Sequence, residues 1–100
     1  EVEADYTFVS GTFNMNLDTD NAFWDKYVRS TLLQLWKHTR HGFAFNLLNV
    51  STDEKYTGLY YAKPEDYLEF AQTHMDPEAA LIVEAPLPDF TILTKRRVPL

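Results

Sequence analysis

The sequence predicts an α/β fold in which mostly parallel strands alternate with two helices. Short β-branched, aromatic or aliphatic runs indicate strands, and two segments with apolar residues at helical spacing indicate helices. The two kinds of segment follow each other as strand, helix, strand, helix, strand, strand. Such alternation favours right-handed crossovers and a parallel sheet, with an antiparallel last strand after a short turn. We expect residues 1–100 to form a single unit of this kind.

The first strand is predicted at residues 6–10, which are β-branched and aromatic and end at Gly11. Residues 18–21 are rich in side chains that cap helices. The helix predicted at 21–39 carries one apolar stripe, formed by Trp24, Tyr27, Val28, Thr31, Leu32 and Leu35. Basic residues near its end suit the negative pole of the helix dipole. Gly42 then permits the helix to terminate.

Residues 42–48 form a short apolar run that is typical of a strand buried on both faces. A polar loop follows over residues 49–61. Pro64 stands where a second helix begins, with acidic residues in its first turn, and Asp76-Pro77 ends that helix. Residues 80–85 and 90–94 are predicted as strands, separated by the turn at 86–89.

Composition and charge exclude several classes of protein. With no cysteine, the chain has neither disulfides nor thiolate metal sites. A formal net charge of −6 argues against a nucleic-acid binder, and the cluster Lys95-Arg96-Arg97 is interpreted as a solvated strand end or a local phosphate or partner contact. No apolar run approaches the roughly 20 residues that span a bilayer. Without a visible leader peptide, we expect a cytoplasmic protein with no membrane contact.

Four stretches together resemble the C-terminal half of class I S-adenosylmethionine-dependent methyltransferases, which are Rossmann-like enzymes. They are the segments ADY to SGTFN at residues 4–14, GFAFNLL at 42–48, LYYAKP at 59–64 and FTIL at 90–93. The resemblance is to a bacterial subgroup and covers nearly the whole chain. It implies a partial methyltransferase sheet whose last strand is antiparallel and inserted beside the fifth. It also implies transfer of a methyl group to an unknown small-molecule acceptor.

The glycine-rich turn that holds the methyl donor in the resembled family is absent from this sequence. The chain has only three glycines, Gly11, Gly42 and Gly58, and no G-x-G motif. We therefore expect the parent protein to use S-adenosylmethionine and this chain alone to bind none. A missing N-terminal half or a separate chain would supply the donor site.

The candidate site residues follow the predicted carboxyl ends of the parallel strands, where ligands of open α/β sheets bind. The resemblance implies that Ser10 and Gly11 adjoin the cofactor. It implies that the acceptor is held by Phe13, Asn14, Asn46, Tyr60 and Tyr61. The structural alternative is that Asn14 caps a turn and that the tyrosines pack a loop.

Two further hypotheses complete the sequence prediction. His38 and His41 are three residues apart but have no acidic third ligand nearby, so we expect no metal and interpret them as helix-end residues. A competing function is a non-catalytic α/β interaction or dimerisation module. It would act through the unpaired edge of the strand at residues 6–10, which favours a homo-oligomer, most simply a two-fold homodimer.

Overall fold

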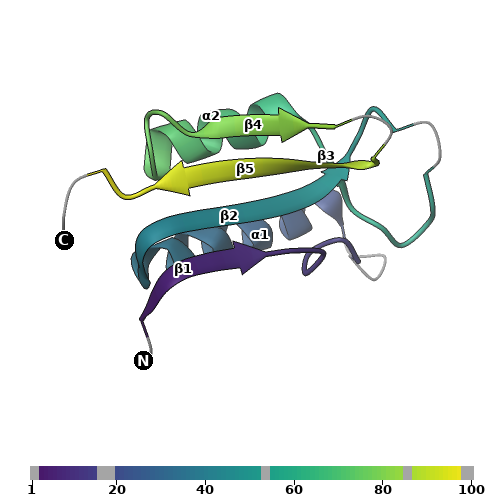
Figure 1. Ribbon diagram of the computed structural model, residues 1–100. Coiled ribbons are helices and arrows are strands. Elements are labelled where there is room, and N and C mark those ends of the chain that lie inside the picture. Colours follow the sequence, from purple (N-terminus) through teal and green to yellow (C-terminus); the bar gives the residue numbers. More distant parts are fainter. Residues whose placement is uncertain (1–2, 16–19, 53–54, 85–86, 98–100) are drawn as a thin grey trace.

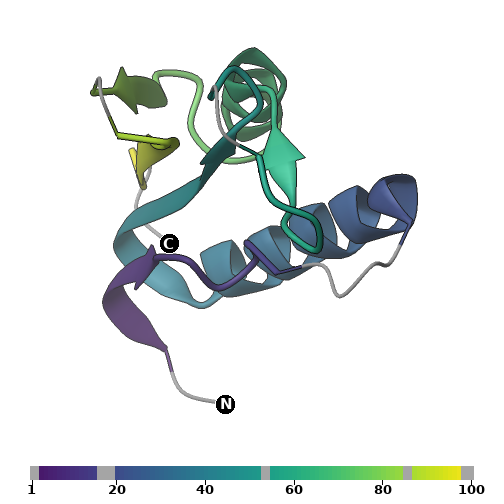
Figure 2. The same cartoon turned by 90° about the vertical axis from the view of Figure 1, so that its right-hand side faces the viewer.

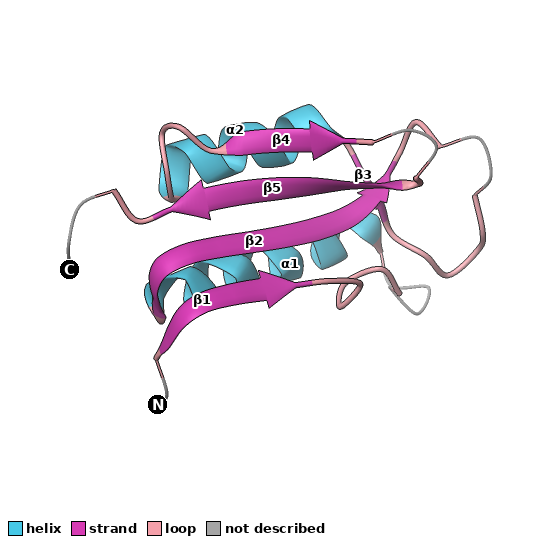
Figure 3. Cartoon of the chain, viewed as in Figure 1, coloured by secondary structure: helices cyan, strands magenta, loops and turns pink. Residues whose placement is uncertain are grey.

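The computed structural model describes residues 3–15, 20–52, 55–84 and 87–97, which form a sheet and two helices (Figure 3). The elements in chain order are β1 (Ala4–Val9), α1 (Asn21–Lys37), β2 (Thr39–Asn49), β3 (Tyr61–Ala62), α2 (Pro64–His74), β4 (Ala80–Val83) and β5 (Asp89–Lys95). Both predicted helices and all four predicted strands are present. The α/β class is therefore confirmed.

The sheet is mixed rather than mostly parallel, which corrects the sequence prediction. Its strand order is β1-β2-β5-β4, with β3 paired to β2 off this path. β1 and β3 pair with β2 in parallel, whereas β5 pairs antiparallel with both β2 and β4. The element order also differs from the expected one, because β3 precedes α2 within the segment predicted to be loop and helix start. The antiparallel last strand was expected, but its position between β2 and β4 makes half of the pairings antiparallel.

Both helices cover the same face of the sheet. Figure 1 shows α1 and α2 behind the strands, and the turned view in Figure 2 places β1, β2, β5 and β4 on the left and both helices on the right. In β2, Phe43, Phe45 and Leu47 are buried toward the helices, whereas the alternate residues Ala44 and Asn46 are half-buried on the opposite face. β2 is therefore buried on one face, and the expectation of burial on both faces is wrong for the described residues.

Local signals define α1 well. The Asp20 side chain accepts a hydrogen bond from Phe23 N at 3.3 Å and caps the N-terminus. The helix ends at Lys37 with His38 as its C-cap, two residues before the predicted end at 39, and Gly42 takes no part in its termination. Gly42 instead lies inside β2. A Cβ atom there would stand 3.0 Å from Tyr6 Cδ1, so glycine lets the aromatic ring approach the strand closely.

The core lies between the helices and the sheet and is rich in aromatic rings. Val28 and Leu32 of α1 are fully buried. Trp36, Phe43, Phe45, Tyr67 and Phe70 form a continuous run of ring contacts with centroids 5.9–6.4 Å apart. The predicted stripe of α1 is confirmed in its centre, although Tyr27 is exposed.

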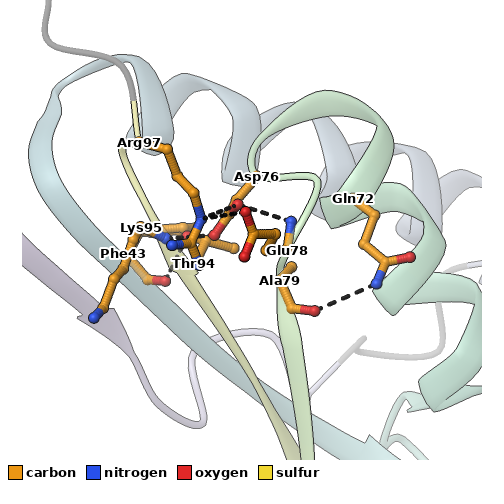
Figure 4. Close-up of polar contacts among 8 residues, drawn as sticks. All are labelled: Phe43, Gln72, Asp76, Glu78, Ala79, Thr94, Lys95 and Arg97. Carbon is orange, nitrogen blue, oxygen red and sulfur yellow. Dashed lines mark hydrogen bonds and ion pairs between the residues drawn. The ribbon is translucent and has the colours of Figure 1, made fainter.

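The basic cluster at the end of β5 contributes to the fold, a role the sequence did not suggest. Arg96 stacks on the Trp36 ring at 3.9 Å and donates to Trp36 O at 2.7 Å. Arg97 Nε donates to Asp76 Oδ1 at 2.8 Å (Figure 4). Asp76 is 1% exposed and also accepts from the backbone N–H of Glu78 and of Lys95, each at 2.9 Å. The carboxylate of Asp76 thus joins the end of α2 to the end of β5.

Neither helix is long and apolar enough to cross a membrane, as far as the described parts of the chain go.

Candidate functional site

The carboxyl ends of β1 and β2 meet at one edge of the sheet, and three predicted site residues are in contact there. Asn46 of β2 accepts a hydrogen bond from Gly11 N through Oδ1 at 3.0 Å. Its Nδ2 donates to Ser10 Oγ at 3.2 Å. Gly11 has φ +71°, which a residue with a side chain rarely adopts. Parallel pairing of β1 with β2 therefore brings Ser10, Gly11 and Asn46 together as one polar cluster, in which Ser10 and Gly11 are exposed and Asn46 is half-buried.

Asn14 lies one turn beyond this cluster and holds an unpaired polar atom. Its N–H donates to Gly11 O at 3.4 Å, and its carbonyl oxygen accepts from Tyr60 N at 2.7 Å. The side-chain Oδ1 is buried and has no hydrogen-bond partner among the described residues. A buried acceptor without a donor costs about 1–3 kcal/mol, so such groups frequently mark a place where a water or ligand is bound.

Phe13 and Tyr60 are buried residues of the hydrophobic core. Phe13 is 3% exposed, and its carbonyl oxygen accepts from Trp24 Nε1 at 3.0 Å. Tyr60 is 5% exposed, and its hydroxyl donates to Asp25 Oδ1 at 2.9 Å rather than pointing toward Asn46. Two hydrogen bonds hold the loop that carries Asn14: one runs from Tyr60 N to Asn14 O, and the other from Trp24 Nε1 to Phe13 O. The burial of both side chains agrees with the structural alternative, in which they pack the fold instead of holding the acceptor.

Tyr61 is the remaining predicted site residue, and it belongs to β3. Its side chain is half-buried. The hydroxyl accepts from Tyr56 N at 2.8 Å, and Lys55 Nζ lies 5.9 Å from the ring centroid. These contacts hold the loop before β3 and are not made with Ser10, Gly11 or Asn46.

A second polar cluster, which the sequence analysis missed, lies between α1 and α2. Asp25 Oδ1 accepts from Tyr67 at 2.6 Å and from Tyr60 at 2.9 Å. The two hydroxyl oxygens are 3.0 Å apart. Arg29 Nε donates to both carboxylate oxygens of Asp25 and its guanidinium lies 4.7 Å from the Tyr67 ring centroid. The Asp25–Arg29 spacing of four residues is visible in the sequence, but the two tyrosines join only through the tertiary fold.

The electrostatics of this cluster favour an ionised Asp25 and neutral tyrosines. Burial alone would raise the pKa of Asp25, but the hydrogen bonds from Tyr67, Tyr60 and Arg29 and the charge of Arg29 lower it below its ordinary value. Burial and the hydrogen bond to the Asp25 carboxylate raise the pKa of Tyr60 to about 12. Burial likewise raises the pKa of Tyr67. The tyrosines therefore act as hydrogen-bond donors at neutral pH. Their bonds to Asp25 connect α1 with α2 and with the loop before β3.

Asp76 has the same electrostatic character as Asp25. Burial would raise the pKa of Asp76, but the hydrogen bonds from Arg97 and from the Lys95 and Glu78 amides lower it overall. Both carboxyl groups therefore have folded-state pKa values below the ordinary 3.8.

We expect stability to fall in acid because of these two carboxylates. The unfolded chain binds more protons than the folded chain below about pH 5, so the contribution is complete above that pH and is lost as the pH falls through about 4 and lower. Urea midpoints measured from pH 7 to pH 2 should be level at first and then drop. Asp76→Asn should flatten the drop more than Asp25→Asn, because water screens the partly exposed Asp25 pair. An undiminished drop in both variants would contradict this assignment.

The described residues hold no group of three or more His, Asp or Glu side chains that could bind a metal ion. His38 caps the end of α1, as the helix-end interpretation expected. His41 instead lies in β2, where its Nε2 is 3.9 Å from Asp5 Oδ1.

Fold and site together define an α/β protein with a polar cluster where two parallel strands end. Comparison with known proteins adds one relative. No family model matches the chain, and no solved structure matches it. The chain is 33% identical, over 96 residues, to a Mycobacterium tuberculosis (strain ATCC 25618 / H37Rv) protein named "Putative methyltransferase Rv1506c". The match covers 94% of this chain and 58% of that protein, so the chain spans little more than half the length of its relative. This similarity supports a methyltransferase relationship.

Proposed function

We propose that this chain forms the acceptor-side part of an S-adenosylmethionine-dependent methyltransferase that acts on a small molecule. The observation that carries the proposal is the hydrogen-bonded cluster of Ser10, Gly11 and Asn46 at the carboxyl ends of β1 and β2. Ligands of α/β sheets bind at this position. The similarity to the mycobacterial protein and the insertion of β5 beside β2 support the same assignment.

The fit of the residues to a methyl donor is partial. Gly11 supplies one left-handed turn at the strand end, but the sequence has no G-x-G motif to cradle a nucleotide-like ligand. S-adenosylmethionine would supply an electrophilic methyl group when bound. The residues of this chain would orient the acceptor, since catalysis by methyl transfer rests largely on proximity and alignment. Asn14 Oδ1 offers an acceptor for an N–H or O–H group of such a molecule.

The 100-residue chain alone should bind S-adenosylmethionine weakly or not at all. The physical reason is the missing glycine-rich turn. Isothermal titration calorimetry measures this directly, with S-adenosylhomocysteine as the matched ligand. A micromolar dissociation constant would mean that the chain holds a complete donor site and that its assignment to the acceptor side is wrong.

The proposed function itself is tested on the full-length product of the gene. That protein should bind S-adenosylmethionine, and Asn46→Ala should weaken acceptor methylation because it removes both bonds that hold the Ser10–Gly11 turn. Lys63→Ala, at an exposed helix cap away from the cluster, is the control. A full-length protein without S-adenosylmethionine binding would favour the non-catalytic alternative.

That alternative is an α/β interaction module, and one observation favours it specifically. Tyr6 and Phe8 of β1 are 76% and 62% exposed on the sheet face that neither helix covers. Large apolar side chains left open on a sheet commonly mark a contact surface.

A further inference from the structure

The backbone around Asn14 is held from two directions. Asn14 O accepts a hydrogen bond from Tyr60 N at 2.7 Å, and the neighbouring Phe13 O accepts one from Trp24 Nε1 at 3.0 Å. Trp24 belongs to α1, whereas Tyr60 immediately precedes β3. Two segments that are far apart in the sequence therefore hold two successive carbonyl groups.

The residues on either side of this pair are bonded as well. Met15 forms an isolated antiparallel bridge with Leu59, the neighbour of Tyr60. Asn14 N donates to Gly11 O at 3.4 Å. Both backbone groups of Asn14 are thus engaged, and the rotamers open to a side chain depend on the backbone that carries it. The contacts of the main chain therefore limit where the Asn14 amide can point.

Tyr60 is itself anchored through its hydroxyl group. The hydroxyl donates to Asp25 Oδ1 at 2.9 Å, and Tyr67 donates to the same oxygen at 2.6 Å. Arg29 Nε donates to both carboxylate oxygens of Asp25. Hydrogen bonds to an ionised acceptor are roughly twice as strong as those between neutral groups. Asp25 follows Trp24 in α1, so the same turn of the helix supplies both anchors.

The side chain of Asn14 lies beside the polar cluster at the strand ends. A Cβ atom placed on Gly11 would stand 3.8 Å from Asn14 Nδ2, and Gly11 N donates to Asn46 Oδ1 at 3.0 Å. Asn14 Oδ1 is buried without a hydrogen-bond partner among the described residues. The bonds that start from α1 therefore end at a side chain that borders the proposed acceptor site.

We propose that the N-terminal half of α1 positions Asn14 for the methyl acceptor. Trp24 acts on the backbone of Phe13, and Asp25 acts through Tyr60. The role rests on the proposed function, because it assigns the acceptor to this side of the sheet. An orienting group displaced by about 1 Å can lower a rate on the order of a hundredfold, so a site of this kind needs supporting bonds behind it.

A matched control separates positioning from general stabilisation of the fold. Thr94 Oγ1 donates to Phe43 O at 2.7 Å, and Thr94 is 4% exposed. It belongs to β5, which β2 separates from β1. Thr94→Val removes one buried hydroxyl group with little change of volume, as Tyr60→Phe does. Both variants should lower the urea midpoint, but only Tyr60→Phe should affect the surroundings of Asn14.

Hydrogen exchange of single amides in the full-length product of the gene, measured by NMR, tests the anchor at Tyr60. In Tyr60→Phe the amide of residue 60 should exchange about tenfold or more faster, because a bond to a charged group that restrains local opening is lost. Thr94→Val should leave that rate within about twofold. Acceleration that is alike in the two variants and follows their urea midpoints would overturn the proposal, since it would show a purely structural bond.

The side-chain amide signals of Asn14 provide a second measurement on the same protein. They should shift in Tyr60→Phe and also in Trp24→Phe, which removes the donor to Phe13 O from the other direction. They should stay in place in Thr94→Val. Unmoved Asn14 signals in either of the first two variants, with the fold intact, would overturn the proposal.

Binding of S-adenosylmethionine to the full-length protein distinguishes this proposal from the proposed function. By calorimetry, Tyr60→Phe should leave the dissociation constant within about twofold, because the loop at residues 13–15 is assigned to the acceptor side. Loss of binding in this variant alone would place Tyr60 on the donor side and overturn the proposal. If the unchanged protein binds no S-adenosylmethionine while the Asn14 signals respond as expected, the methyltransferase function fails and the anchoring of Asn14 by α1 is still supported.

Discussion

Asp76→Ala should lower the free energy of unfolding by about 1–3 kcal/mol, the cost of leaving partly buried donors without an acceptor. The Asp76 carboxylate is 1% exposed and accepts three hydrogen bonds, one of them from Arg97 (Figure 4). Its removal leaves the Glu78 and Lys95 amides without their acceptor and separates the end of α2 from the end of β5. Equilibrium urea denaturation at pH 7 provides the measurement.

The matched control for this change is Glu78→Ala. Glu78 lies 3.9 Å from the same Arg97 Nε, but its side chain is 74% exposed. Its loss should alter the free energy of unfolding by no more than about 0.5 kcal/mol. Similar losses in the two variants would mean that the charge near Arg97, rather than the buried acceptor at Asp76, stabilises this corner.

Leu32→Ala should cost about 2–5 kcal/mol of unfolding free energy, as buried leucine truncations do. Leu32 is 0% exposed in the middle of α1, so alanine would leave a cavity between the helix and the sheet. Leu87→Ala serves as the control, because Leu87 is 58% exposed. The urea midpoint should fall for Leu32→Ala and hold for Leu87→Ala. An unchanged midpoint for Leu32→Ala would show that this face of α1 is not part of the core.

The burial of Trp24 was predicted only in part from the sequence pattern. Its position in the apolar stripe of α1 predicts burial, but the structure leaves it only partly buried, with Nε1 donating to Phe13 O. Helical periodicity identifies which side of α1 faces inward. It does not say how far the sheet extends over the first turn, which depends on where β1 and its following loop lie.

The sequence likewise predicted part of the candidate site and missed the rest. Ser10, Gly11 and Asn46 were predicted to meet from the rule that parallel strands end at one edge of the sheet, and their contact depends only on the pairing of β1 with β2. Tyr60 was predicted to face the same place. Its hydroxyl turns instead to Asp25, because a buried tyrosine needs a hydrogen-bond partner and the Asp25 carboxylate of α1 is within reach.

The sequence by itself determined the α/β class, both helices and the predicted strands, because these depend on local periodicity, capping and turn residues. Only the tertiary structure decided that the sheet is mixed rather than mostly parallel, that both helices share one face, and that Asp25 and Asp76 gather partners from distant segments. Strand order and buried polar contacts are set by which elements pack together across the whole chain. A short stretch of sequence does not specify these long-range contacts, whereas helix caps and the alternation of strands depend on residues that are close in the sequence.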